Sequence, residues 1–131
     1  MTIAFEQPTL SEQPTGSPVR QAWTATELLR KVDNDIDLAT ELVEIFLEDA
    51  PEMSDDISVA VQHGDAAALA SAAHAYKGSA AAIGAVAVAR AAGALEASGR
   101  AGSTSVELEV AYFKELEVRL IDQLSAVATD S

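Results

Sequence analysis

The sequence predicts an all-α protein: an up-and-down four-helix bundle with a short N-terminal cover helix. From Trp23 onward, apolar residues recur every three or four positions, which is the period of a helix with one buried face. The same region contains no alternating apolar and polar runs of the kind that indicate strands. Glycines and capping residues divide it into one short and four longer segments joined by short turns.

A chain of 131 residues has room for one domain with one core and a tail. Residues 1–21 include Pro8, Pro14, Gly16 and Pro18 among small polar residues. Because this composition buries little apolar surface, we expect a flexible N-terminal tail over residues 1–21 and the bundle domain over residues 22–128. Aromatic residues make up only 5% of the chain and alanine supplies much of its apolar content, so we expect the helices to pack close together.

We expect a short helix from about Thr24 to Val32, closed by residues 33–35, whose acidic and amide side chains can also cap the next helix. The apolar stripe of that second helix consists of Leu38, Leu42, Ile45, Phe46, Met53, Ile57 and Ala60. Pro51 lies inside it and lacks a backbone donor, so we expect a kink near Leu47 or two helices that meet there. Gly64 ends the segment, because glycine readily adopts the left-handed conformation after a helix.

The next two helices are also bounded by caps and glycines. Asp65 is expected to cap the third helix, which runs to about Ile83 and is ended by Gly84. The fourth helix is expected over about Ala85 to Ser98, where Gly99 stops it. Its inward residues are Val88, Ala91, Ala92 and Leu95.

Thr104 and Glu107 have the spacing of a capping box, so we expect the fifth helix to begin at Thr104. Its apolar stripe consists of Leu108, Phe113, Leu116, Leu120, Leu124 and Val127. Short turns between long amphipathic helices favour antiparallel packing about one core.

The formal net charge is −13, from 8 Lys and Arg residues against 21 Asp and Glu residues. Such a chain would be repelled by phosphate backbones and anionic lipid surfaces, so we expect neither nucleic acid nor membrane as a partner. No stretch approaches the ~20 apolar residues of a membrane span, and the N-terminus lacks the pattern of a signal peptide. The chain has no cysteine, which excludes disulfides and thiolate chemistry. We therefore expect a cytoplasmic protein, and a monomer.

The stretch HAYKGSAAAIG, residues 74–84, places a histidine on the outer face of the third helix. At about 100° per residue, the side chains that point toward the core are those of Leu69, Ala72, Tyr76 and Ile83. His74 points the other way, and its neighbours on that face are Ala67, Ala70, Ser71, Lys77, Gly78 and Ala81. Most of these side chains are very small, so we expect an exposed and accessible imidazole.

Gly78 has no turn to make, although a glycine inside a helix costs about 0.5–1 kcal/mol relative to alanine. It lies one turn after His74 on the same face, where a missing side chain lets a partner surface or a phosphoryl group approach the ring. Lys77 can bring its ammonium group to the same space and balance phosphoryl charge.

AAHAYKGSAAAIGA resembles the signature of histidine-containing phosphotransfer (HPt) domains, in which a histidine is followed after two residues by Lys-Gly-Ser and later by a glycine that closes the helix. ATELLRKVDNDIDLATELVEIFLEDAPEM resembles the first two helices of this family, and ALEASGRAG resembles its usual end of the fourth helix. The resemblance implies that His74 is the phosphoacceptor, with Lys77 and Gly78 as auxiliary residues. Ser79 occupies the first serine position of the family. Ala80 stands where many members carry a second serine, at a position that leans toward the core.

The resemblance further implies a member of a two-component phosphorelay, which accepts a phosphoryl group on His74 from a receiver-domain aspartate and passes it on or back. Its partners would be receiver domains of response regulators or hybrid histidine kinases. The receiver would supply Mg²⁺, and this chain would bind no cofactor. We expect a phosphocarrier without autokinase activity, because the sequence has no glycine-rich phosphate loop and no length for an ATP-binding domain. The docking face would include Ala67, Ala70, Ser71 and Ala81, and residues of the second helix that the sequence does not single out.

A second hypothesis is a non-transferring helical adaptor that docks on a receiver or kinase and regulates it by binding alone. The presence of His74, Lys77 and Gly78 together favours phosphotransfer, since an adaptor has no need of all three. No metal site is expected, because His63 and His74 do not have the four-residue spacing of helical zinc sites. His63 is expected to interact with the dipole at the end of its helix.

Overall fold

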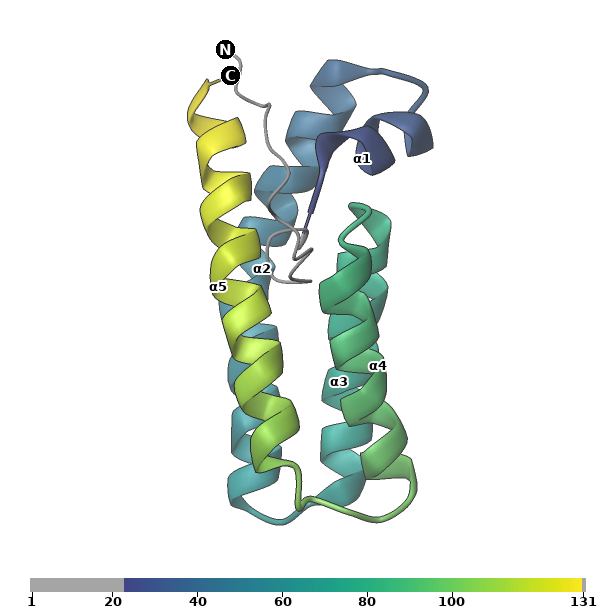
Figure 1. Ribbon diagram of the computed structural model, residues 1–131, viewed down its shortest axis with the longest axis vertical. Helices are drawn as coiled ribbons and strands as arrows, with labels where there is room; N and C mark the ends of the chain where they lie inside the picture. The colour runs from purple at the N-terminus through teal and green to yellow at the C-terminus, as the bar shows by residue number, and fades with distance from the viewer. Residues whose placement is uncertain (1–22, 131) are drawn as a thin grey trace, which may run out of the picture.

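The computed structural model describes residues 23–130, and the predicted tail of residues 1–21 lies outside this range. Its elements are α1 (Ala25–Lys31), α2 (Ile36–Gln62), α3 (Ala66–Ala82), α4 (Val86–Arg100) and α5 (Glu107–Asp130). Figure 1 shows α2, α3, α4 and α5 running side by side along the long axis, with the short α1 across one end. The predicted all-α fold, a four-helix bundle with a cover helix, is confirmed. None of the helices within residues 23–130 combines the length and the apolar character needed to cross a membrane.

Short polar side chains set the starts of α2 and α3. The Asp35 carboxylate accepts a hydrogen bond from the Leu38 amide at 3.0 Å, and Asp65 accepts one from the Ala68 amide at 3.0 Å. Gly84 follows α3 with a φ of 76°, the left-handed conformation that ends many helices. The predicted cap and the predicted end of α3 are therefore confirmed.

α2 is one helix of 27 residues that continues through Pro51. Of the two alternatives predicted for this position, the division into two helices is therefore wrong. Pro51 itself is exposed, whereas Phe46 and Ala50 before it and Ile57 after it are buried. Both halves of α2 therefore bury the same face against the rest of the bundle. This packing offsets the backbone hydrogen bond that the proline removes.

The buried face of α2 differs from the predicted stripe in the first half of the helix. Leu38 and Ile45 are 40% and 49% exposed, although both were predicted to be in the core. The smaller Ala39 and Val43 point inward instead, because the helical period, and not the size of a side chain, decides which positions face the core. The remaining residues of the predicted stripe are buried or partly buried: Leu42, Phe46, Met53, Ile57 and Ala60.

α4 continues to Arg100, so the prediction that Gly99 stops this helix is wrong. Gly99 lies inside α4 and is buried against α3. A Cβ added to it would lie 2.7 Å from both the Ala66 carbonyl oxygen and the Ala70 nitrogen, so glycine permits a close approach of the two backbones. Gly102, with a φ of 84°, follows the end of the helix. The predicted inward residues of α4 are all buried: Val88, Ala91, Ala92 and Leu95.

α5 begins at Glu107, so the predicted start at Thr104 is wrong. Leu108, predicted to be buried, is 84% exposed, whereas Val106 directly before the helix is buried. The first turn of α5 therefore meets the bundle through the residue that precedes it. The predicted core residues Phe113, Leu116, Leu120 and Leu124 are buried, and the side chain of Val127 lies outside the described part of the chain.

Tyr76 fixes the rotation of α3 about its own axis. Its ring packs edge-to-face against Phe46 of α2, at a centroid distance of 5.7 Å, and against Phe113 of α5, at 4.7 Å. Its hydroxyl donates to Glu117 Oε2 at 2.7 Å, and the Ser54 hydroxyl donates to Oε1 of the same carboxylate at 2.8 Å. Burial and the Glu117 charge raise the pKa of Tyr76, so it remains a donor. With Tyr76 held in the core, the opposite face of α3 must face outward.

We predict opposite effects for two glycine-to-alanine substitutions. Gly99→Ala forces a Cβ against the backbone of α3, and it should lower the free energy of unfolding by about 1–3 kcal/mol. Gly78→Ala should raise it by about 0.5–1 kcal/mol, because no atom lies within 4 Å of the added Cβ and alanine favours a helix. Urea unfolding followed by circular dichroism measures both values. Changes of the same sign would contradict the packing described for α3 and α4.

Candidate functional site

His74 lies in the middle of α3 on the side away from the core. The buried face of this helix consists of Leu69, Ala73, Tyr76 and Ala80. The His74 side chain is 64% exposed, in agreement with the helical wheel. Ala72, which the wheel placed inward, is only partly buried, and Ala73 takes its place in the core. The helix is unbroken on both sides of the imidazole, so the ring stands on a rigid support.

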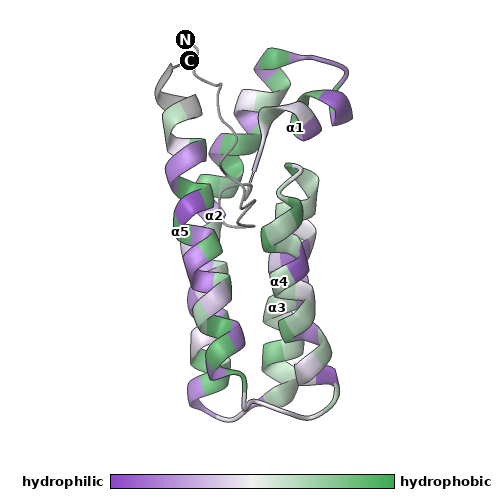
Figure 2. Cartoon of the chain, viewed as in Figure 1, coloured by the Kyte–Doolittle hydropathy of each residue, from purple (hydrophilic) through white to green (hydrophobic). Residues whose placement is uncertain are grey.

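The surface around His74 is made of small side chains. Figure 2 shows that α3 and α4 are pale or green over most of their length, because alanine dominates both helices, whereas α5 alternates between polar and apolar residues. Ala67, Ser71 and Ala81 are exposed as predicted. Ala70 is partly buried, since Gly99 of α4 packs against its backbone. Along α3 itself, the small side chains leave little bulk in the way of a partner that approaches the ring.

Glu96 of α4 lies beside His74, and sequence reasoning missed it. Its side chain is only 6% exposed, and its Oε2 lies 3.0 Å from His74 Nδ1. Oε1 lies 2.6 Å from Lys77 Nζ, and Oε2 also lies 2.6 Å from Arg100 Nη2. Both oxygens are used in these contacts. Within residues 23–130, no group of three His, Asp or Glu side chains is arranged to hold a metal ion.

The partners of Glu96 hold it in its charged form. The hydrogen bond from Lys77 has the largest effect, and together with those from Arg100 and His74 it lowers the pKa of Glu96 to about 2, against the opposing effect of burial. At neutral pH this group is a carboxylate, which can only accept hydrogen bonds. His74 Nδ1 must therefore carry the proton of their shared hydrogen bond. The neutral ring then keeps its free electron pair on Nε2.

Comparison with known protein families matches residues 41–130 to the Hpt domain. This match covers well over half of the chain. The chain belongs to the Hpt domain family. A search of curated proteins and a search of solved structures each find no match. Hpt domains in general are helical phosphocarriers that take part in histidine phosphotransfer in phosphorelays, and they interact with receiver domains or kinases.

The other residues singled out in this Hpt domain lie close to His74. Lys77 is 40% exposed and its ammonium group is held by Glu96. Gly78 is exposed, and a Cβ added to it would meet no atom within 4 Å, so the space one turn after His74 is open. Ala80 is fully buried, in agreement with the expectation that this position leans toward the core.

One signal in the sequence could have pointed to Glu96. It follows Ala92 by four positions and so falls on the inward stripe of α4, where a carboxylate needs a partner. Arg100, four residues further along, has the spacing of a helical ion pair. Neither feature identifies His74, which is 22 residues away and meets Glu96 only through the packing of α3 against α4.

Glu96→Gln should destabilise this Hpt domain in a pH-dependent way. Because the pKa of Glu96 in the folded state is below its ordinary value of 4.5, its ion pairs stabilise the fold above that pH and lose this effect as the pH falls toward 2. The melting temperature of the wild type should exceed that of Glu96→Gln at about pH 7, and the difference should shrink at about pH 3.

Glu115→Gln provides the control, because Glu115 is exposed and its ion pair with Arg119 spans 3.9 Å. It should change the melting temperature little at either pH. A Glu96→Gln difference that stays constant between the two pH values would contradict the assignment of a depressed pKa to Glu96.

Proposed function

We propose that this Hpt domain carries a phosphoryl group on His74, which it accepts from the aspartyl phosphate of a receiver domain and passes on or back. The observation that carries the proposal is the 3.0 Å hydrogen bond between the exposed His74 ring and the buried Glu96 carboxylate. This bond orients the ring and, in the neutral tautomer, assigns the proton to Nδ1 and the free electron pair to Nε2. An exposed ring nitrogen with a free electron pair is a nucleophile at neutral pH.

In the proposed reaction, His74 Nε2 attacks the phosphorus of the aspartyl phosphate. An N–P bond forms, the P–O bond to the aspartate breaks, and the aspartate leaves as a carboxylate. The ring keeps its Nδ1 proton and becomes positively charged, so no base has to remove a proton. Glu96 faces that proton and stabilises the charge. Onward transfer reverses the same bond changes.

Lys77 and Gly78 prepare the space in which the phosphoryl group would sit. Phosphoryl transfer depends mainly on positioning and on neutralising charge. Lys77 is held beside the ring by Glu96, and from there its ammonium group can turn to the phosphoryl oxygens. Gly78 leaves room for the group and for the partner surface.

The receiver supplies the remaining part of the machinery. We assign Mg²⁺ to the receiver, no bound cofactor and no autokinase activity to this chain, and we expect it to act as a cytoplasmic monomer. The receiver contact covers the exposed Ala67, Ser71 and Ala81, while Ala70 supports the packing against Gly99 at its edge.

Transfer from a receiver charged with acetyl phosphate tests the proposal. The wild type should take up label that is stable in alkali and labile in acid, as phosphohistidine is, and His74→Gln should take up none. His63→Gln is the matched control, because His63 is the other histidine of the chain, and it should be labelled like the wild type. Equal labelling of wild type and His74→Gln by every receiver of the source cell would favour a helical adaptor that acts by binding alone.

Bulk at position 78 should block access to His74. Gly78→Phe should slow transfer roughly 10²-fold, because the ring would occupy the space beside the imidazole and displace the reacting groups. Gly78→Ala should slow it far less. Circular dichroism should show both variants folded, since the added atoms meet open space. A normal transfer rate in Gly78→Phe would show that access at this position is not required.

A further inference from the structure

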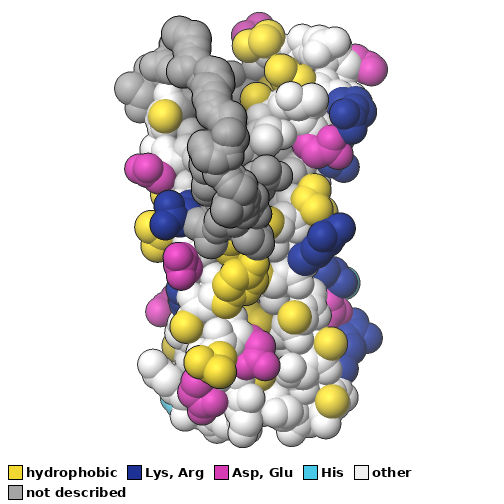
Figure 3. Space-filling model, viewed as in Figure 1, with side chains coloured by type: hydrophobic (Ala, Val, Ile, Leu, Met, Phe, Trp, Pro, Cys, Tyr) yellow, Lys and Arg dark blue, Asp and Glu magenta, His cyan; other side chains and the backbone are white. Residues whose placement is uncertain are grey.

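Cationic side chains of this acidic chain gather on one edge of the bundle. The net charge is −13, yet α1, α3 and α4 together carry Arg30, Lys31, Lys77, Arg90 and Arg100. Figure 3 shows Lys and Arg side chains following one another along the edge that these three helices form. Within residues 23–130, neither Lys31 nor Arg90 forms an ion pair. Their charge is therefore available to a partner.

Three of these cations border a groove between α1, α3 and α4, which we call the basic groove. Its lining residues are Glu27, Lys31, Lys77, Ala81, Gly84, Val86, Ala89, Arg90 and Gly93. Several of these residues are small, and Gly93 lies close to Lys77: a Cβ added to it would be in van der Waals contact with the Lys77 side chain, at 3.4 Å. Val86 is 46% exposed and contributes an apolar side chain to the lining. The basic groove therefore combines an apolar contact with three cations and one carboxylate, Glu27.

The basic groove is continuous with the His74 site. Lys77 borders both, and Gly93 lies three residues before Glu96 on α4. Ala81 follows His74 by seven residues on α3, which corresponds to about 10 Å along the helix axis. A receiver domain that places its aspartate against the imidazole therefore also lies within reach of the basic groove.

A second groove of opposite character lies on the other side of α3. It runs between α2 and α3 and is lined by Asp56, Val59, Ala60, His63, Asp65, Ala68, Ser71, Ala72 and Ala75. We call it the acidic groove, after Asp56 and Asp65. His74 thus stands on a helix with positive charge along one flank and negative charge along the other. This polarity distinguishes two orientations of a partner that docks over the ring.

We propose that the basic groove binds a segment of the receiver domain in which carboxylates flank an apolar side chain, and that this contact sets the orientation of docking. The proposal rests on the proposed phosphotransfer function. Lys31 and Arg90 pair with the carboxylates, and Val86 packs against the apolar side chain. Repulsion by the rest of this acidic chain disfavours the same segment elsewhere on its surface.

Charge reversal tests the basic groove. Lys31→Glu and Arg90→Glu, both at exposed positions, should each reduce the second-order rate of phosphotransfer from the receiver about tenfold at low salt. The loss should shrink as salt screens the charges. Phosphoramidate is a small phosphoryl donor that needs no docking surface. The rate at which it labels His74 should therefore be the same in both variants as in the wild type.

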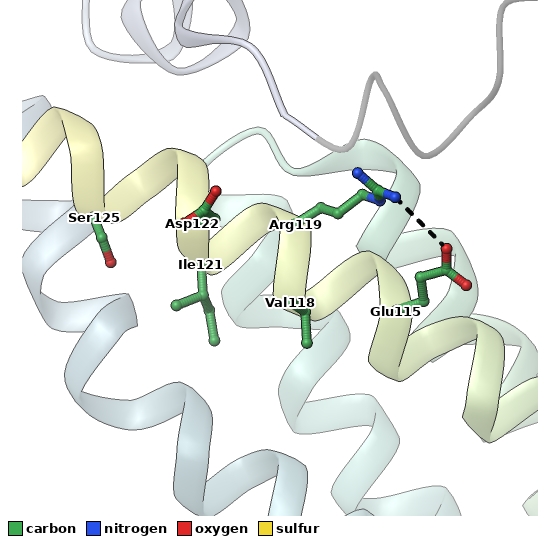
Figure 4. A pocket seen from close by; sticks show the side chains of 6 residues that line it. All are labelled: Glu115, Val118, Arg119, Ile121, Asp122 and Ser125. Carbon is green, nitrogen blue, oxygen red and sulfur yellow. Dashed lines mark ion pairs between the residues drawn. The ribbon is translucent and has the colours of Figure 1, made fainter.

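Arg119→Glu is the matched control, because it makes the same change in net charge on α5. Figure 4 shows Arg119 in an open pocket of α5 beside Glu115, and α5 lies diagonally across the bundle from α3 (Figure 1). Arg119→Glu should leave the rate of phosphotransfer near that of the wild type. Equal losses in Arg119→Glu and in the two groove variants would overturn the proposal, since they would reflect net charge alone.

Titration of receivers into ¹⁵N-labelled protein separates this proposal from the proposed function. Backbone amides of Gly84, Ala89 and Gly93 should shift on binding, and Lys31→Glu should weaken these shifts. Shifts confined to the acidic groove would overturn the basic-groove proposal while leaving phosphotransfer intact. Equal changes in the amide chemical shifts with inorganic phosphate alone would identify a general anion site, and they would also overturn the basic-groove proposal. If no receiver shifts these amides and none labels His74, both proposals fail.

Discussion

The Glu96 carboxylate lies buried between α3 and α4 and accepts hydrogen bonds from His74, Lys77 and Arg100. A carboxylate can occupy such a place only when partners replace its lost hydration, and three donors do so here. The same contacts orient the imidazole, put its proton on Nδ1 and hold a cation next to it. The arrangement on the outer surface of α3 therefore depends on a group that belongs to α4.

The contact between Glu96 and His74 exists because two features of the bundle fix the position and the rotation of α3. Gly99 lets the backbone of α4 come against Ala66 and Ala70, which brings Glu96 within reach of the ring. On the opposite side, Tyr76 is held by aromatic contacts and by the Glu117 carboxylate. Rotation of α3 by one residue, about 100°, would carry His74 out of this contact. The rigid core thus presents the ring, and the surface around it, in a single orientation.

Errors in the sequence-based prediction share one physical cause. Leu38 and Ile45 were assigned to the core because they are large and apolar, and Gly99 was assigned to a helix end because glycine often stands there. In the bundle, the position of a residue decides both questions. Ala39 faces inward because it lies on the same helical face as the buried Val43 and Phe46, and Gly99 is needed where two backbones meet. Local preferences contain no information about such contacts.

The helical fold, the capped starts of α2 and α3, and the outward direction of His74 could all be predicted from the sequence, because each follows from the helical period or from a hydrogen bond within a few residues. The small side chains around the ring could be predicted in the same way. The packing of the helices was needed to establish that Glu96 meets His74 and that the cations of α1, α3 and α4 border one groove. These groups are far apart along the chain, and their distances depend on how closely and in what register the helices pack.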